Sequence, residues 1–534
     1  MPFPKITILF LFILTFIGGV NRLYRLSENP PGATLDAISI GYNAFTIRTA
    51  GIDQDGNRLP LGHFRSLGDY KLPLQIYLVA LSQMKFGNSL LAIRLPSAIL
   101  GTLTIPLVFF LSQVIFEKLN IHPKKNQILC LFSTFLFTIS PWHSFHSRLG
   151  LETSIGLFFA LATILFLFLA LKKPKILLIA ALCLLLTAYT YHAYWVFLPP
   201  LIFIFFIFHR SYIFLHRKIL LLAIILITIG LTPLLTEKNQ GNTARFNQSF
   251  ISSEHIAKRK QEAQQTCGTE NFCINANITM QLINHMLNQY VTAFSFITWY
   301  GPSKFDPVDV VPFRGLFYFI ELPLLLIGII ALIKIKNKAT IFLLSWLLLY
   351  PLPIVVTNSI TAARMYELLP LPYIIETLGF YDIIKKQRYL AVPILLFLCF
   401  IFARFVADLW FVYPFGYSRQ IDYGMISIRQ SIDKEPYNVW YVEEPLFHRL
   451  HLFYFYNILP QYIQPPQWST RGRTITQYQN IILVERGYLP PETSNNRLIS
   501  FQEDIPKNYE KIGVVPLKSG EIYAYVSAPK KEKL

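Results

Sequence analysis

The chain has 534 residues, of which 53% are hydrophobic and only 15% are charged. This composition is more apolar than that of soluble domains and is typical of a protein that lies in a bilayer. The formal net charge is +18, and the basic residues collect in short clusters between apolar runs. The charge therefore indicates membrane topology, and no nucleic-acid partner needs to be invoked.

Eleven apolar runs reach or approach the ~20 residues that span a hydrocarbon core. We expect these runs to be helical, because they show no period-2 alternation and a helix satisfies its own backbone in lipid. The sequence therefore predicts an all-α polytopic membrane bundle of about eleven transmembrane helices. The predicted spans lie near residues 5–20, 90–116, 127–142, 151–171, 175–191, 196–208, 219–235, 314–333, 339–356, 366–384 and 389–413.

Basic clusters follow every second predicted span. They are Lys118 to Lys125, Lys172 to Lys175, Arg210 to Lys218, Lys334 to Lys338, and Lys385 to Arg388. The positive-inside rule places these turns in the cytoplasm. We keep the first segment as an uncleaved helix, because Gly18 to Arg22 is a poor signal-peptidase site. The prediction is a multi-pass protein of the cytoplasmic (plasma) membrane with its N-terminus inside.

The segments between the remaining spans are then expected to face outward. In the first outer loop (21–89), the apolar stretch from Leu72 to Phe86 is too short to span and is predicted to lie along the interface. In the large outer loop (236–313), residues 278–297 have the pattern of a second interfacial helix. These loops belong to a predicted transmembrane domain, residues 1–413.

The tail from 414 to 534 changes composition and is predicted to be a small extracytoplasmic α/β domain. Short strand-like runs cover residues 438–442, 480–484 and 521–526, and the Ser519-Gly520 pair is typical of a hairpin turn. The sequence contains no evident internal repeat.

Two of the five cysteines, Cys267 and Cys273, lie in a polar stretch of the large outer loop. An outer pair could close a structural disulfide, since that compartment is oxidising. A metal site is the weaker alternative, because two cysteines without a nearby histidine pair supply too few ligands.

A linked series of motifs resembles bacterial members of glycosyltransferase family 39, which includes the protein O-mannosyltransferases and the aminoarabinose transferases of lipid A. The resemblance covers roughly residues 5–385. It rests on residues 35–50, 53–57, 68–74, 92–101, 140–143 with 147, 148 and 152, 189–199, and 362–364 with 369 and 370. It implies the GT-C fold and transfer of a sugar from a polyprenyl-phosphate donor to a protein, lipid or polysaccharide acceptor at the outer membrane face.

The resemblance also implies catalytic carboxylates in the outer loops. Asp36 occupies the position of the acceptor-activating base, which takes the proton that the attacking hydroxyl loses. Many relatives carry Asp-Glu where this chain has Asp36-Ala37, so Glu152 or Asp69 is predicted to supply the second acid. The alternatives are that Asp36 caps a helix from residue 37, that Asp69 pairs with Lys71, and that Glu152 complements a helix dipole.

The donor phosphate needs cations at the membrane surface. Lys71, Arg94 and Arg364 are the candidates, and the alternative is that they extend to lipid headgroups. Further candidates for lining the substrate site are Tyr42, His143, Arg148 and His192. No metal site is predicted from the histidines and no cofactor is predicted, while dependence on a divalent metal is left open.

A competing function is a flippase or permease for a lipid-linked sugar. It predicts charges buried at mid-membrane and pseudo-symmetric halves, whereas the acids and arginines here concentrate at the outer ends of the predicted helices. A glycan receptor is the weaker third reading, because it leaves the ordered loop motifs unexplained.

Overall fold

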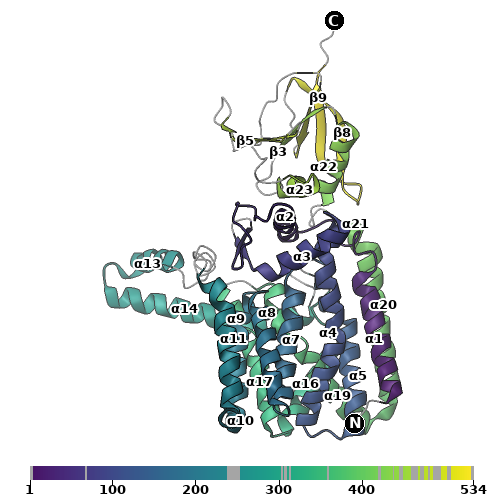
Figure 1. The fold of residues 1–534 in the computed structure, drawn as a ribbon, viewed down its shortest axis with the longest axis vertical. Helices are drawn as coiled ribbons and strands as arrows, with labels where there is room; N and C mark the ends of the chain where they lie inside the picture. The colour runs from purple at the N-terminus through teal and green to yellow at the C-terminus, as the bar shows by residue number, and fades with distance from the viewer. Residues whose placement is uncertain are drawn as a thin grey trace.

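A computed structural model gives the fold of the chain (Figure 1). It describes residues 4–66, 69–236, 253–301, 305, 310–311, 314–357, 360–418, 423–436, 438–443, 449–458, 467–468, 474–478, 481–484, 493, 495–501 and 507–530.

The body of the molecule is a bundle of roughly parallel and antiparallel helices (Figure 1). Its elements are α1 (Lys5–Leu23), α4 (Leu90–Lys118), α5 (Pro123–Ile139), α7 (Thr153–Ala170), α8 (Leu177–Ala188), α9 (Ala193–Phe208), α10 (Arg210–Leu215), α11 (Arg217–Thr236), α16 (Glu321–Lys334), α17 (Lys338–Leu349), α18 (Leu352–Thr357), α19 (Leu371–Lys386) and α20 (Ala391–Ala407), which η4 (Asp408–Val412) and α21 (Tyr413–Gly416) continue.

Every predicted span overlaps one or two of these helices, although the span predicted at 314–333 is helical only from Glu321 and the one at 366–384 only from Leu371 as an α-helix. Among the described residues, six helices are long and apolar enough to cross a membrane, and three apolar helices are shorter. The all-helical membrane bundle is therefore confirmed as an architecture, whereas the number of eleven crossings stays a prediction.

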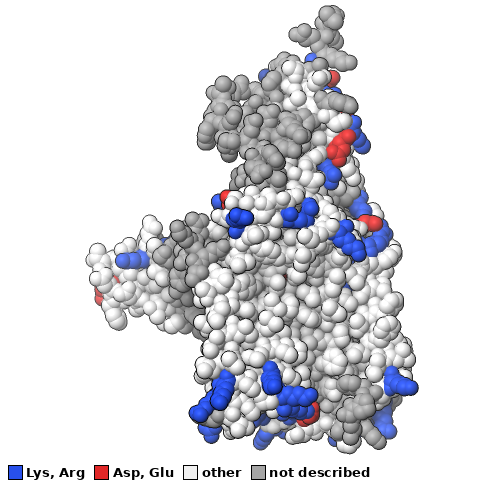
Figure 2. All heavy atoms as spheres, viewed as in Figure 1, with Lys and Arg blue, Asp and Glu red and all other residues white. Residues whose placement is uncertain are grey.

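The two ends of the bundle differ in what they carry. The turns with the basic clusters lie at the end opposite the C-terminal sheet, where Lys and Arg side chains gather (Figure 2). Between this basic end and the other end, the visible face is almost free of charge (Figure 2). Large apolar side chains of the bundle helices, such as Phe12, Phe203 and Phe400, are exposed. This belt is what contact with lipid requires. The side of the membrane that each end faces stays a prediction.

Three short elements cover the end of the bundle that carries the sheet. They are α2 (Leu35–Ala50), the antiparallel ribbon of β1 (Phe64–Ser66) and β2 (Asp69–Lys71), and α3 (Pro73–Phe86). Helix α3 coincides almost residue for residue with the predicted interfacial stretch from Leu72 to Phe86. Pro73 is its first residue, where a helix has no use for the backbone N–H that proline lacks. Helix α6 (Pro141–His146) follows α5 directly in the chain.

The large outer loop supplies α13 (Ser253–Cys267), α14 (Asn271–Ala293) and α15 (Phe296–Tyr300). Helix α14 matches the predicted amphipathic segment and projects sideways from the bundle with α13 (Figure 1). A disulfide joins Cys267 at the end of α13 to Cys273 in the first turn of α14. The pair therefore holds the corner between these two helices.

The C-terminal part contains a seven-stranded mixed sheet in the order β4-β5-β6-β3-β7-β9-β8. Strand β3 runs parallel to both of its neighbours, and β8 and β9 form an antiparallel hairpin whose turn includes Ser519 and Gly520, as predicted. The elements are α22 (Tyr423–Lys434), α23 (Arg449–Phe455), β3 (Val439–Glu443), β4 (Gln467–Trp468), β5 (Thr474–Tyr478), β6 (Ile481–Val484), β7 (Asn496–Ser500), β8 (Tyr509–Pro516) and β9 (Ile522–Pro529). The domain boundary at residue 414 stays a prediction.

Candidate active site

A lysine and two carboxylates meet where the first outer loop touches the bundle. Lys71 Nζ lies 3.1 Å from Asp36 Oδ2 and 3.3 Å from Glu152 Oε1. The side chains of Lys71 and Glu152 are 8% and 10% exposed, whereas that of Asp36 is 50% exposed. The three residues, called here the carboxylate–lysine triad, thus form a buried ion pair with one further acid at the surface.

A side-chain hydrogen bond helps to position Lys71 relative to Glu152. Lys71 ends β2, and the side-chain Nε2 of Gln75, in the first turn of α3, donates to the carbonyl of Gly150 at 3.0 Å. Gly150 has φ +77°, and a Cβ there would lie 2.9 Å from the Ile93 side chain. Only glycine meets both demands, so the turn before Glu152 can approach α4 and the start of α3 closely.

Asp36 is not the cap of its helix. Helix α2 begins at Leu35, and the Thr34 hydroxyl accepts the backbone N–H of Ala37 at 3.2 Å. Thr34 therefore supplies the cap that was the alternative role for Asp36. Ala37 itself is fully buried, so a carboxylate at that position would have to be desolvated.

Glu152 stands at the N-cap position of α7, yet its side chain makes no capping bond. One carboxylate oxygen pairs with Lys71, and the other, Oε2, is buried without a hydrogen-bond partner among the residues that the structure describes. A buried acceptor of this kind favours a ligand that can donate to it.

The 3-10 helix η2 (Ala363–Leu368) brings Arg364 to the same region. Tyr366 of η2 lies with its hydroxyl 3.2 Å from Ser154 Oγ, in the first turn of α7. Arg364 is partly exposed in this helix, close enough to Glu367 to act on it electrostatically. Arg364 thus lies on an element that packs against the start of α7, and its role as a phosphate ligand stays a prediction.

Arg94 and Arg148, by contrast, are buried and bound to backbone. The guanidinium of Arg94 donates to the carbonyls of Leu26, Pro30 and Gly32. That of Arg148 donates to the carbonyls of Asn21, Tyr24 and Asn29 at 2.7 to 2.8 Å. Both arginines hold the loop that leads into α2, and these contacts differ from the predicted contacts with phosphate or substrate.

The remaining candidates fall into two groups. His143 is buried beside Arg22, with Nδ1 2.8 Å from Nη2, and Tyr42 is buried with its hydroxyl donating to the carbonyl of Ile458. His192 is nearer the triad, since its ring stacks on His63 in the loop before β1. Asp69 belongs to β2, but its side chain lies outside the described part of the structure.

Two residues of this region were missed by the sequence analysis. Tyr366 contacts the rings of His143 and His146 and the hydroxyl of Ser154, and His63 contacts His192. His63 is a titratable residue in the first outer loop, close in sequence to the motif at 68–74, so its position in the sequence indicates a candidate site residue. Tyr366 lies at the start of the apolar span predicted at 366–384, and no feature of the residue itself indicates a functional role. Among the described residues, no group of three His, Cys, Asp or Glu side chains could hold a metal ion.

An apolar cavity of about 300 Å³ opens between α8, α9 and α11. Tyr194 and Trp195 line it together with leucines of all three helices. Tyr194 also packs against Gly156, where a Cβ would lie 2.7 Å from its ring. The cavity therefore lies next to the helix turn that follows Glu152.

No protein-family model and no curated protein matches this sequence. Among solved structures, the chain is similar to the archaeal oligosaccharyltransferase AglB from Archaeoglobus fulgidus in complex with an inhibitory peptide and a dolichol-phosphate, at 13% identity and a TM-score of 0.46. It is also similar to ArnT from Cupriavidus metallidurans, at 11% identity and a TM-score of 0.46 in the apo state, and at 10% and 0.44 with undecaprenyl phosphate bound. The match covers 84% of this chain with 63% of AglB and 84% of ArnT, so the chain spans less than two thirds of the length of AglB.

Proposed function

We propose that this chain is an integral membrane glycosyltransferase, which moves a sugar from a polyprenyl-phosphate donor to an acceptor hydroxyl at the end of the bundle that carries the sheet. The observation that carries the proposal is the carboxylate–lysine triad. It combines a cation with two acids, one solvent-accessible and one buried, each within 3.3 Å of the lysine Nζ. Acceptor activation and phosphate stabilisation require these same groups.

Asp36 is the proposed base. The acceptor hydroxyl attacks the anomeric carbon of the donor, and its proton passes to the Asp36 carboxylate. The bond between the anomeric carbon and the phosphate oxygen breaks, and its electron pair leaves with the lipid phosphate. Asp36 suits this role because it is half exposed, and because Thr34 already caps the helix.

Lys71 is the proposed phosphate ligand, with Arg364 as the second cation. The ammonium of Lys71 carries three N–H donors, and an incoming phosphate would compete with Asp36, the more exposed of its two partners. That exchange would release the Asp36 carboxylate when the donor arrives. Glu152 keeps the ammonium in place from the buried side, and its free oxygen is available to a sugar hydroxyl.

The apolar cavity beside α7 supports a lipid donor. Apart from Thr187, its walls are aliphatic and aromatic side chains, which suit an isoprenoid chain and offer little to a free sugar nucleotide. Membrane lipids are expected neighbours of the surrounding belt. The acceptor is proposed as protein, lipid or glycan.

The proposal is tested with the purified full-length protein and a panel of polyprenyl-phosphate sugars. Mass spectrometry of envelope glycans and glycoproteins from cells with and without the gene names the sugar and the acceptor. Asp36→Asn should abolish transfer while donor binding persists, and Lys71→Gln should weaken donor binding. Matched controls are Glu28→Gln, an exposed acid of the same loop, and Lys85→Gln, an exposed lysine of α3. Normal transfer by Asp36→Asn would refute the assignment.

A buried carboxylate pair favours the permease as the second candidate. Glu321 of α16 and Glu376 of α19 are both buried inside the bundle and close enough to interact electrostatically. Neither oxygen of Glu376 has a hydrogen-bond partner among the described residues. Buried intramembrane acids of this kind are typical of proton-coupled transport.

The two functions separate in one experiment. If the chain is a permease, the wild type should translocate a lipid-linked sugar across the membrane of proteoliposomes and show no covalent transfer, and Glu376→Gln should lose this translocation. A glycosyltransferase should transfer the sugar in detergent solution, where translocation has no meaning.

A further inference from the structure

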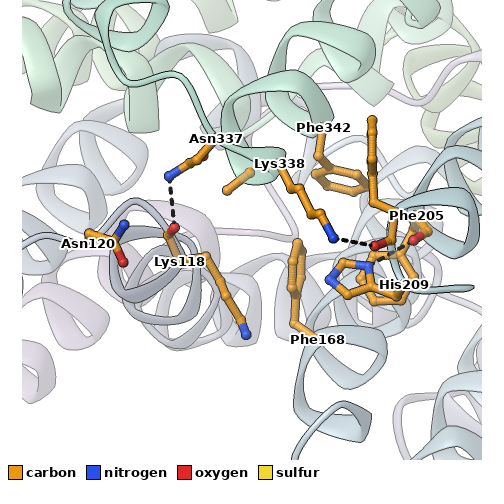
Figure 3. Close-up of a pocket in the computed structure, with 10 residues that line it drawn as sticks. Lys118, Asn120, Phe168, Phe205, His209, Asn337, Lys338 and Phe342 are labelled. Atoms are coloured by element: carbon orange, nitrogen blue, oxygen red, sulfur yellow. Dashed lines mark hydrogen bonds between the residues drawn. The ribbon is translucent and has the colours of Figure 1, made fainter. Parts of the chain in front are cut away.

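A second pocket lies at the basic end of the bundle, lined by residues of the basic turns after α4 and α9 and before α17. In Figure 1 this end lies opposite α2 and α3. The volume of the pocket is about 260 Å³, and it is formed where α4 and α9 end and α17 begins (Figure 3). Nothing in the proposed transfer reaction uses it. We call it the basic pocket.

Three side chains that can carry positive charge converge on the basic pocket. Lys118 ends α4, His209 follows α9, and Lys338 begins α17. Lys338 Nζ donates to the carbonyl of Phe208 at 3.0 Å, and the Nδ1 of His209 is 2.8 Å from the carbonyl of Phe205 (Figure 3). Burial lowers the pKa of His209, and the charges of Lys118 and Lys338 lower it further, against that hydrogen bond, which raises it. Both lysines are therefore close to the imidazole.

The charge of the basic pocket is not balanced from within. None of its lining residues is an acid, and Lys118 Nζ has no hydrogen-bond or ion-pair partner among the described residues. Other lysines at this end are paired, Lys172 with Glu117 at 2.7 Å and Lys386 with Asp382 at 3.1 Å. A cluster of cations without a counter-charge favours an anion as its ligand.

Aromatic rings form the apolar wall. Phe168 and Phe205 pack edge to face with centroids 5.1 Å apart, and Phe342 lies 5.3 Å from Phe168. All three rings line the pocket (Figure 3). The pocket is thus lined by both cationic and aromatic side chains, which matches a phosphate that is attached to a hydrocarbon.

We propose that the basic pocket binds the phosphate group of a ligand, with a phosphate-bearing lipid of the adjoining leaflet as its source. The phosphate would lie between Lys118 and Lys338, within reach of His209, and the start of the acyl region would lie against the phenylalanine rings. The ends of α4 and α9 are where the charge-free belt gives way to basic side chains (Figure 2), so the phosphate layer of a membrane would lie at this level.

The test uses the full-length protein in a neutral detergent and native mass spectrometry. The probes are short-chain phosphatidic acid, phosphatidylcholine of the same chain length, and glycerol phosphate. Wild-type protein should retain phosphatidic acid above phosphatidylcholine, and the Lys118→Gln/Lys338→Gln variant should bind it about tenfold or more weakly, since it loses charge-assisted hydrogen bonds. Lys175→Gln/Lys218→Gln, which removes two exposed lysines of the same end, should bind as the wild type does.

The single variant Lys118→Gln tests whether weaker binding by the double variant is caused by misfolding. Among the described residues Lys118 Nζ has no hydrogen-bond or ion-pair partner, so this substitution should leave the fold intact. Binding by this variant should also fall. If glycerol phosphate binds with the same dependence on Lys118 and Lys338, phosphate recognition stands and the source is soluble. Equal losses in both double variants, or no preference of the wild type for phosphatidic acid, would overturn the proposal.

Discussion

Lys71 and Glu152 form a buried ion pair, with 3.3 Å between Nζ and Oε1, although 81 positions separate them in the chain. The pair joins the first outer loop to the start of a bundle helix. The same lysine lies 3.1 Å from Asp36, so Glu152 is the acid that the proposal takes as the second carboxylate. The proposed site therefore depends on a contact between two distant segments.

Replacing Glu152 should impair the reaction more than the fold. Glu152→Gln keeps the shape but removes the charge that holds Lys71, and we expect transfer to slow by about 10- to 100-fold, because a hydrogen bond to a charged group is worth about 1.5–3 kcal/mol. Single-turnover kinetics with saturating donor measures this. Glu117→Gln breaks a comparable but exposed ion pair with Lys172 and should cost little. A Glu152→Gln enzyme with the wild-type rate would remove Glu152 from the site.

Substitutions of Thr34 and Asp36 should have different effects, because Thr34 caps α2 and Asp36 is the proposed base. Thr34→Ala removes the cap of α2 and should lower the free energy of unfolding by about 1 kcal/mol, with transfer largely kept. Asp36→Asn should leave thermal unfolding unchanged and abolish transfer, because an amide cannot take the proton. If Asp36→Asn destabilised the protein as strongly as Thr34→Ala, Asp36 would have a structural role instead.

Substitutions of Arg94 distinguish its predicted role as a phosphate ligand from a structural role as a donor to loop carbonyls. Arg94→Met leaves three loop carbonyls without their donor, and each unsatisfied buried group costs about 1–3 kcal/mol. We expect a lower thermal unfolding temperature, and only partial recovery in Arg94→Lys, since an ammonium cannot span carbonyls that a planar guanidinium reaches together. A stable Arg94→Lys protein with only a raised KM for the donor would support the phosphate role instead.

Orientation is tested by labelling from outside the cell. Ser519 lies in the exposed turn between β8 and β9, and Lys218 is exposed at the basic end. In a Cys399→Ala background, Ser519→Cys should react with an impermeant thiol reagent in intact cells, whereas Lys218→Cys should react only after lysis. The reverse pattern would contradict the positive-inside assignment.

The basic pocket has a titration signature. Lys118 and Lys338 lower the pKa of His209, because a nearby positive charge disfavours protonation. Lys118→Gln/Lys338→Gln should therefore raise the pKa of His209, and a bound phosphate should raise it in the wild type. Carbon-detected NMR of labelled histidine measures both shifts, with Lys175→Gln/Lys218→Gln as the unshifted control. If the pKa of His209 is unchanged in Lys118→Gln/Lys338→Gln, the two lysines do not act on the imidazole, and the arrangement proposed for the basic pocket is contradicted.

The sequence by itself determined the elements and their order. Long apolar runs such as residues 90–116 must be helices in lipid, and the basic clusters between them gather at one end because consecutive helices reverse direction. The strands near 438, 480 and 521 and the hairpin at Ser519 followed from alternation and turn residues. These are local properties, and local patterns suffice for them.

Only the tertiary structure decided which polar side chains face one another. Arg94 and Arg364 offer identical donors, yet Arg94 binds loop carbonyls while Arg364 lies on the element that packs against the start of α7. The ion pair of Glu152 with Lys71 is likewise a contact across the fold. A buried polar group must be satisfied, but many partners can satisfy it. Which partner does so depends on long-range packing, and this information is absent from any single stretch of the chain.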